Sequence, residues 1–205
     1  MENIIVRVAK EDDSKYSQEI VDEMASSAKA RGTGIAKRTP EYVSGKMKEG
    51  KGVIALTEGG QWVGFCYIES WGHEKFVANS GLIVSPSFRG RGVAKAIKFT
   101  AFRLSRKKFP GAKIFGLTTG LQVMKINHEL GYSPRSVQRA YRRRRVLEGL
   151  PELRQFPDSH SQKPQKLPLY RYALRPRVGN RDRSQRLEQT LREGKVWREK
   201  RDCRI

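Results

Sequence analysis

A glycine-rich turn between a strand pattern and a helix pattern carries the clearest chemical signal in the sequence. Residues 89–94 read Arg-Gly-Arg-Gly-Val-Ala. The first N–H groups of a helix have no intrahelical partner and carry a partial positive charge, and glycines let an anion approach the backbone closely. Arg89 and Arg91 add guanidinium donors, and Lys95 and Lys98 add positive charge along the same helix. The turn therefore predicts a pyrophosphate-binding site.

Other interpretations of this turn exist, and the neighbouring sequence weighs against them. Arg-Gly-Arg-Gly alone is also compatible with a solvated turn, and Arg/Gly-rich stretches occur in RNA-binding tails. The spacing differs from the Rossmann fingerprint, with no acidic residue suitably placed on a following strand end. No Gly-Lys-Ser/Thr follows, which excludes a P-loop. The order strand, turn, helix favours the pyrophosphate site.

The elements that must position this turn follow from hydrophobic periodicity. Alternating and β-branched segments predict strands over 3–8, 52–57, 61–71, 76–85 and 113–119. Apolar residues at helical spacing predict helices over 16–28, 40–47, 93–109 and 120–130. We expect Asp12, Asp13 and Ser14 to cap the first helix, and Val123 and Ile126 to face inward from the last. The order β-α-α-β-β-β-α-β-α predicts an α/β (α+β) fold with a mixed sheet and helices on both faces.

Composition limits the class of protein. With 205 residues, of which 37% are apolar, the chain has enough for one core. No run of about 18 apolar residues is present, and the first residues lack the form of a secretory signal. Cys66 and Cys203 have neither a metal-type nor a redox-type spacing. We therefore expect a soluble, cytoplasmic protein without a membrane partner, a disulfide framework or a bound metal.

Charge divides the chain near Pro134. Residues 1–134 hold 21 Lys+Arg against 13 Asp+Glu, whereas residues 135–205 hold 21 against 8. The later segment thus carries +13 of the formal +21, and its basic residues change from mostly Lys to 17 Arg and 4 Lys. We predict a domain over 1–134 and a basic, poorly ordered tail over 135–205.

The turn and its neighbours resemble the GNAT acyltransferases. The hallmark of that family, Gln/Arg-x-x-Gly-x-Gly/Ala after the fourth strand, is met by Arg89, Gly92 and Ala94. The resemblance covers about residues 3–134 and includes the element order. More narrowly, residues 52–134 look like bacterial N-acetylglutamate synthase-like GNAT proteins of arginine biosynthesis, through Gly-Phe-Cys-Tyr-Ile-Glu at 64–69, the strand at 78–84 and Met-Lys-Ile-Asn at 124–127.

The resemblance implies acetyl-CoA as cosubstrate and a mixed, mostly antiparallel GNAT sheet. The pyrophosphate would be held by backbone amides of the turn, namely Gly90, Arg91, Gly92, Val93 and Ala94, beside Arg89. The pantetheine arm would pair like an added strand with the backbone of Ile83, Val84 and Ser85. A backbone N–H in the range 82–84 would stabilise the oxyanion of the tetrahedral intermediate.

The acid and base positions depart from the family pattern. The tyrosine that protonates the leaving thiolate in many members is replaced by Asn127, which has no labile proton, and the acidic residue often found early in the fourth strand is Asn79. Glu69, His73 and Glu74 are candidate bases, or else solvated charges at a strand end. Asn79 and Asn127 would orient substrate or cofactor, or else be satisfied core amides.

The Arg-rich tail admits two explanations. Its run at 142–145 is compatible with binding to RNA or a ribosomal surface, although prolines break most of its periodicity and leave 187–197 as the only plausible helix. Related proteins continue with a stretch resembling Phe-Ser-Glu-Leu-Thr-Asp-Asp-Glu-x-Phe-Trp-Lys-Gly-Cys. Codons for that stretch, read two bases later, encode Gln138 to Pro151. This favours a frameshifted reading of the family C-terminus.

The sequence thus predicts an N-acetyltransferase acting on a primary amine, with an amino acid such as glutamate as the acceptor implied by the resemblance. Two alternatives remain at this level. One is a GNAT domain that modifies or binds an RNA-associated macromolecule through the tail, and the other is a non-catalytic acyl-CoA binder. The sequence carries no motif for the acceptor pocket or for an oligomer interface.

Overall fold

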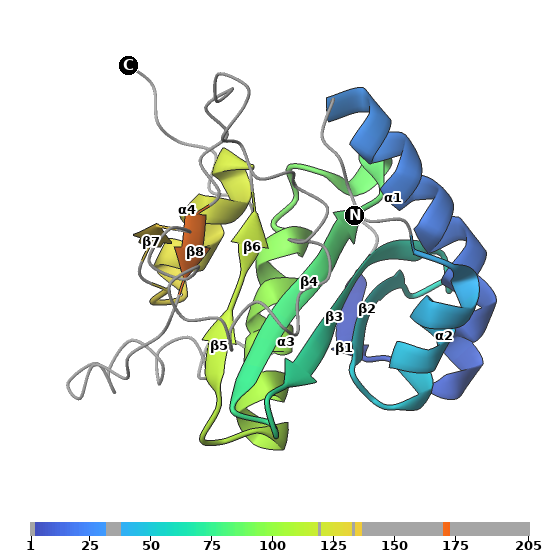
Figure 1. Ribbon diagram of the computed structural model, residues 1–205. Helices are drawn as coiled ribbons and strands as arrows, with labels where there is room; N and C mark the ends of the chain where they lie inside the picture. The colour runs from blue at the N-terminus through green and yellow to red at the C-terminus, as the bar shows by residue number, and fades with distance from the viewer. Residues whose placement is uncertain (1–2, 32–37, 119, 133, 137–169, 173–205) are drawn as a thin grey trace, which may run out of the picture. The chain divides into compact units, whose positions relative to one another are not determined.

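The computed structural model describes residues 3–31, 38–118, 120–132, 134–136 and 170–172 (Figure 1). These residues all belong to one compact unit that spans Glu2–Leu174. The predicted tail, 135–205, therefore lies mostly outside the described residues, as does the helix expected over 187–197.

A five-stranded mixed sheet forms the centre of this unit (Figure 1). The strand order follows the sequence, and β1 to β4 pair antiparallel whereas β5 runs parallel to β4. The strands are β1 (Ile4–Val8), β2 (Gly52–Thr57), β3 (Trp62–Trp71), β4 (Phe76–Val84) and β5 (Lys113–Phe115). This architecture confirms the predicted mixed, mostly antiparallel GNAT-type sheet.

Helices cover both faces of the sheet. The four helices are α1 (Ser17–Arg31), α2 (Pro40–Lys48), α3 (Val93–Lys108) and α4 (Leu121–Glu129). Alternate residues of β3 serve the two faces, so that Phe65 and Tyr67 join the core under α1 and α2, while Cys66 and Ile68 join the core under α3. Thr39 is the N-cap residue of α2, and its hydroxyl accepts the N–H of Tyr42 at 3.3 Å.

A β-bulge interrupts the pairing of β3 with β4. Phe65 pairs with Ile83 and Tyr67 with Ser80, which leaves Gly81 and Leu82 opposite Cys66. Gly81 has a φ of 63°. A Cβ at this position would overlap the Tyr67 ring, with 2.7 Å to Cδ1. Only glycine satisfies both constraints, and the bulge sits midway along the strand that leads to the glycine-rich turn.

The element ends differ from expectation at two places. Asp12, Asp13 and Ser14 lie within a 3-10 helix, Glu11–Tyr16, and do not cap α1. The carboxylate of Asp13 instead accepts hydrogen bonds from Arg7 at 2.7 and 2.8 Å and from the backbone N–H of Lys10. On α4 the buried residue is Asn127, whereas Val123 and Ile126, which were expected to face inward, are only partly buried.

A second, three-stranded sheet was not expected. The segment predicted as one strand over 113–119 divides into β5 and β6 (Leu117–Thr118). Strand β8 (Tyr170–Tyr172) pairs antiparallel with β6 on one side and with β7 (Pro134–Ser136) on the other.

None of the helices in the described ranges has the length and apolarity needed to span a membrane.

Candidate active site

The glycine-rich turn has the geometry of an anion cradle. It connects the 3-10 turn Pro86–Phe88, which follows β4, to α3, and Gly90 and Gly92 both have a φ of 78°. Gly92 is the N-cap residue of α3, and the first helical hydrogen bonds run from Lys95 and Ala96 to its carbonyl oxygen. A Cβ on either glycine would meet no described atom within 4 Å. The space in front of these main-chain groups is therefore open to a ligand such as pyrophosphate.

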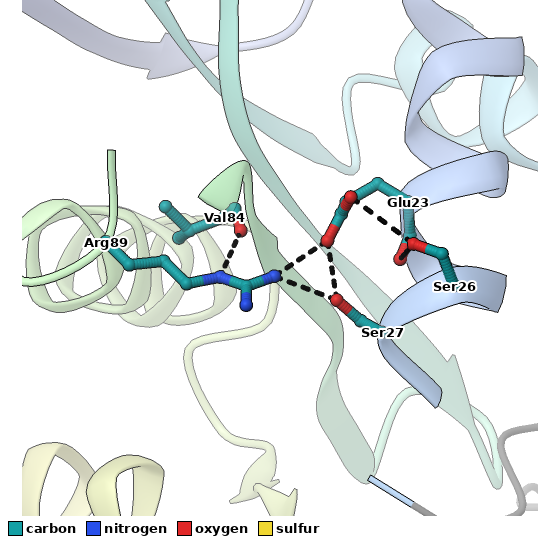
Figure 2. A network of polar contacts seen from close by, with 5 residues as sticks. All are labelled: Glu23, Ser26, Ser27, Val84 and Arg89. Carbon is teal, nitrogen blue, oxygen red and sulfur yellow. Dashed lines mark hydrogen bonds and ion pairs between the residues drawn. The ribbon is translucent and has the colours of Figure 1, made fainter. Parts of the chain in front are cut away.

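The side chain of Arg89 points away from this cradle and toward α1 (Figure 2). Its Nε donates to the carbonyl oxygen of Val84 at 3.0 Å. Its Nη2 lies 2.7 Å from Oε1 of Glu23 and donates to Oγ of Ser27 at 2.8 Å. Arg89 thus fixes the turn to the end of β4 and to α1, whereas the side chain of Arg91 in the same turn is exposed.

The two lysines predicted to extend the positive charge of the turn have other partners. Lys95 pairs with Glu129 of α4, with 2.6 Å between Nζ and Oε2. Lys98 is 2% exposed and faces the interior. Lys98 therefore adds its charge to the interior and not to the exposed surface of the helix. It lies four residues after Ala94 and three before the buried Ala101, a helical spacing that could have indicated its burial.

Strand β4 loses its parallel neighbour after its first three residues. The pairing with β5 ends at Ala78 and Phe115, whereas β4 continues to Val84. Ile83 and Val84 are buried, while the stretch 80–82 and Ser85 are only partly so. The N–H of Ser85 donates to Val63 on β3 at 2.9 Å, which continues the ladder on that side. On the other edge, no strand in the described part of the chain pairs with β4 beyond Ala78.

On the α1/α2 face, Glu69 lies in a polar group that we call the Glu69 cluster: Arg38, Tyr42, Lys46, Tyr67 and Glu69. Glu69 accepts the hydroxyl of Tyr42 and lies 2.8 Å from Nζ of Lys46. Nε of Arg38 donates to the hydroxyl of Tyr67 at 2.7 Å. Burial, aided by Glu69, raises the pKa of Tyr42, and burial raises that of Tyr67. Glu69 is therefore not a solitary solvated charge.

Residues of the Glu69 cluster other than Glu69 were not identified as site residues from the sequence. Tyr42 was expected only on the buried side of α2, and Arg38 and Lys46 belong to no motif. His73 and Glu74, the other candidate bases, are exposed in the turn between β3 and β4, with φ values of 54° and 62°. That turn begins shortly after Glu69, but no hydrogen bond or ion pair within the described ranges joins His73 or Glu74 to the Glu69 cluster.

On the α3/α4 face, a second polar group lies in the interior. We call it the Lys98 cluster: Asn79, Lys98, Ser105, Asn127 and Tyr132. Asn79 donates to Oγ of Ser105 at 2.8 Å and accepts the hydroxyl of Tyr132 at 2.6 Å. Its amide thus has core partners on both atoms. Asn127 is fully buried, and neither of its amide atoms has a hydrogen-bond partner among the described residues.

Burial controls the ionisation of the groups around this second cluster. It lowers the pKa of Lys98, because a desolvated ammonium is disfavoured. It raises the pKa of the Cys66 thiol to about 11 and also raises that of Tyr132. In the described ranges no three His, Cys, Asp or Glu side chains come together as metal ligands would.

The mixed sheet, whose fourth strand separates from the fifth and leads into a glycine-rich helix start, is the arrangement that the resemblance to GNAT acyltransferases predicted. Within that class, residues 36–126 match the model of the Acetyltransferase (GNAT) family. The match covers slightly less than half of the chain, and it supports an acetyltransferase that uses acetyl-CoA. The open cradle at Gly90 and Gly92 fits this cosubstrate.

Solved structures agree with this fold. A GNAT-family acetyltransferase of Staphylococcus aureus Mu50 superposes with a TM-score of 0.56 at 13% identity, covering 84% of this chain and all of that one. One from Listeria monocytogenes 4b F2365 gives 0.54 at 15%, covering 83% and 95%. N-acetylglutamate synthase of Neisseria gonorrhoeae, solved with coenzyme A and N-acetyl-glutamate, gives 0.52 at 17%, covering 75% of this chain but 31% of that one. No curated protein sequence matches the chain significantly.

Proposed function

We propose that this enzyme transfers the acetyl group of acetyl-CoA to the primary amine of a small molecule, with an amino acid such as glutamate as the acceptor. The proposal rests on one observation, namely a path in which the open glycine-rich turn continues into the edge of β4 that has no described neighbour. The path begins at the open glycine turn and follows the free edge of β4, from Val84 back to the point where β5 leaves it at Ala78.

Along this path each part of acetyl-CoA has a counterpart. The pyrophosphate accepts hydrogen bonds from the main chain of Gly90, Arg91, Gly92, Val93 and Ala94. The pantetheine arm lies along Ile83, Val84 and Ser85, and the thioester ends beside the bulge at Gly81, where a backbone N–H in the range 82–84 stabilises the oxyanion. The bulge supports this placement because it turns main-chain groups of β4 out of the regular ladder.

The acceptor binds on the α1/α2 face, at the Glu69 cluster. Glu69 lies on β3 directly opposite Ala78, where β4 loses its neighbour. The free α-amino group of an amino acid titrates near about 8, so a carboxylate acting through water suffices as base. Arg38 and Lys46 bring positive charge to the same cluster, which favours an acceptor with carboxylates. His73 lies in the turn that follows β3, and we assign the base to Glu69 because Glu69 has described partners in the cluster.

The Neisseria enzyme solved with N-acetyl-glutamate adds support to an amino-acid acceptor. It shares the arrangement of strands at 17% identity, so the likeness concerns the fold. The acceptor identity rests on the charged cluster and on the sequence resemblance at 52–134.

A panel assay tests this function. Release of free thiol from acetyl-CoA is measured with each amino acid in turn, and glutamate is expected to give the highest kcat/KM. Arg89→Ala removes the bonds that hold the turn to Val84 and Glu23, and it should raise the KM for acetyl-CoA about 10-fold or more. Lys107→Ala, at the exposed end of the same helix, is the matched control. Thiol release that no amino acid stimulates would contradict the acceptor class.

For the segment 135–205 we propose an out-of-frame reading of the family C-terminus that has no function of its own. The change from Lys to Arg and the codon relation at 138–151 support this hypothesis. The nucleotide sequence tests it directly, because another reading frame must encode the family ending. Salt-sensitive RNA binding by the intact chain would instead favour a docking role for the tail.

A further inference from the structure

Lys98 is a buried cation that the proposed reaction has not yet used. Its side chain is 2% exposed, and its Nζ donates to the backbone oxygen of Asn79 at 3.4 Å. No carboxylate in the described part of the chain forms an ion pair with it. An ammonium without a counter-ion is costly to bury, so its retention indicates a role beyond packing.

The side-chain nitrogens of Lys98 and Asn127 both lie close to Gly116. A Cβ built on Gly116 would lie 3.3 Å from Nζ of Lys98 and 3.1 Å from Nδ2 of Asn127. Gly116 directly follows Phe115, the last residue of β5 that pairs with β4, and Asn79 directly follows its partner Ala78. The two polar groups therefore lie where the pairing of β4 with β5 ends.

The side-chain amide of Asn127, which lies where the pairing of β4 with β5 ends, lacks hydrogen-bond partners in the described part of the chain. Both atoms of its amide are buried and have no hydrogen-bond partner among the described residues. A buried amide in this condition is unusual in a folded protein and is typical of a site completed by a ligand. If acetyl-CoA follows the path proposed above, its sulfur arrives here, at the end of the pantetheine arm.

We propose that Lys98 is the general acid that protonates the sulfur of coenzyme A. This inference rests on the proposed acetyl-CoA path. The neutral amine attacks the thioester carbonyl, a C–N bond forms, and the C–S bond breaks with its electron pair moving to sulfur. The ammonium of Lys98 transfers a proton to that sulfur and becomes neutral. The nitrogen of the new amide loses its proton through Glu69 and water, and solvent reprotonates Lys98.

The environment of Lys98 matches this task. A thiol has an ordinary pKa near about 8.5, and an ordinary lysine near about 10.4 is too weak an acid to protonate its thiolate readily. Burial lowers the pKa of Lys98 and so brings the two groups closer. The titratable groups that face Lys98 are Cys66 of β3 and Tyr132, which follows α4. Burial raises the pKa values of both side chains, so both stay neutral near pH 7.

The competing explanation is a structural one, in which Lys98 only packs against its neighbours. Its Nζ lies 5.9 Å from the centre of the Tyr132 ring, a distance compatible with a cation–π contact. A structural cation would be needed for stability and would have no effect on proton transfer. The two explanations therefore make opposite predictions for stability and for the pH dependence of kcat.

Three variants of the full chain separate these explanations. Lys98→Met is similar in length and apolar, and Lys98→Arg keeps the charge but cannot give up a proton near neutral pH. Lys107→Met, at an exposed position of the same helix, is the control. Both Lys98 variants should bind CoA in calorimetry but lose kcat by about 10²- to 10⁴-fold, without the alkaline fall in kcat of the wild type. Lys107→Met should match the wild type. Unchanged kcat and pH profile in both Lys98 variants would overturn the proposal.

A second measurement needs no turnover. The ultraviolet absorbance of the thiolate reports the pKa of the thiol of bound CoA. The ammonium of Lys98 should lower that pKa in the wild type and in Lys107→Met, and the lowering should be lost in Lys98→Met. An identical thiol pKa in the wild type and Lys98→Met would overturn the proposal. A wild type that takes up no CoA would instead refute the acetyl-CoA path itself.

If Lys98→Met fails to fold, the wild type still decides the matter. Its kcat must fall at alkaline pH with an apparent pKa below that of an ordinary lysine, and the fall must be absent from the pH dependence of CoA binding. A kcat that stays level up to the ordinary lysine pKa, about 10.4, would overturn the role of Lys98 as acid.

Discussion

The two polar clusters on opposite faces of the sheet differ in how completely their groups are paired. In the Glu69 cluster the carboxylate has both a hydroxyl donor and a lysine, and its side chain is 23% exposed. In the Lys98 cluster a lysine that is 2% exposed has no carboxylate, and the amide of Asn127 has no hydrogen-bond partner among the described residues. Unpaired polar groups are costly, so they are expected where a ligand completes them. This difference is why we propose the acceptor site at the Glu69 cluster and protonation of the leaving thiol at the Lys98 cluster.

The largest effect is expected at the bulge that separates the two clusters. Gly81→Ala forces a side chain into the Tyr67 ring at a positive φ, and it should lower the free energy of unfolding by about 2–5 kcal/mol. Gly90→Ala shares the positive φ but meets open space, so it should cost only about 1–2 kcal/mol. Urea unfolding of both variants measures the difference. Equal losses would mean that the close approach of Tyr67 is unimportant.

A matched pair of tyrosine variants tests the difference in burial. Tyr132→Phe leaves the buried Oδ1 of Asn79 without its 2.6 Å donor and should lower the free energy of unfolding by about 1–3 kcal/mol. Tyr42→Phe removes a donor to Glu69, which retains Lys46 and access to water, and should cost less than about 1 kcal/mol. Denaturant titration gives both values. A larger loss of stability in Tyr42→Phe than in Tyr132→Phe would contradict the difference in burial between the two clusters.

Lys98 should also affect how stability depends on pH. Its pKa is lowered in the folded protein, so between that value and the unfolded value near 10.5 the unfolded chain binds more protons. The free energy of unfolding should therefore rise with pH in this window, by at most about 1.4 kcal/mol per pH unit. Thermal unfolding of Lys98→Met should lack this rise and show equal or higher stability below it. A variant less stable than the wild type at neutral pH would indicate a structural cation.

The smallest effect is expected from the corresponding lysine on the other face. Lys46→Met removes the ion pair with Glu69 and should change the free energy of unfolding by about 0–1 kcal/mol, because both side chains retain contact with solvent. Its influence should weaken in high salt. Denaturation at two ionic strengths checks both points, and a loss above about 2 kcal/mol would show that this cluster is buried as firmly as the other.

Patterns along the chain were enough to predict most of the fold. Hydrophobic periodicity located α1 to α4 and β1 to β5 to within a few residues, and the glycines of the turn identified the strand–turn–helix junction. Periodicity could not reveal the bulge at Gly81, because a glycine inside an apolar strand has several structural explanations. The pairing of β8 with β6 and β7 depends on residues more than thirty apart in sequence, and no local pattern marks it.

The site was less predictable because its side chains come together only in the folded protein. Lys98 carries the same charge as its neighbour Lys95, and only its place on the helix distinguishes a buried group from a surface one. Glu69 was identified as a candidate base by its position at a strand end. Its partners Tyr42 and Lys46 lie more than twenty residues earlier, and nothing in their spacing links them to it.

Calorimetric titration of the full chain with coenzyme A tests the central claim most directly, because it requires neither an acceptor nor turnover. The account predicts saturable binding at one site per chain, weakened about 10-fold or more in Arg89→Ala and unchanged in Lys107→Ala. Absence of heat from coenzyme A and acetyl-CoA, with protein whose cooperative unfolding shows that it is folded, would contradict it.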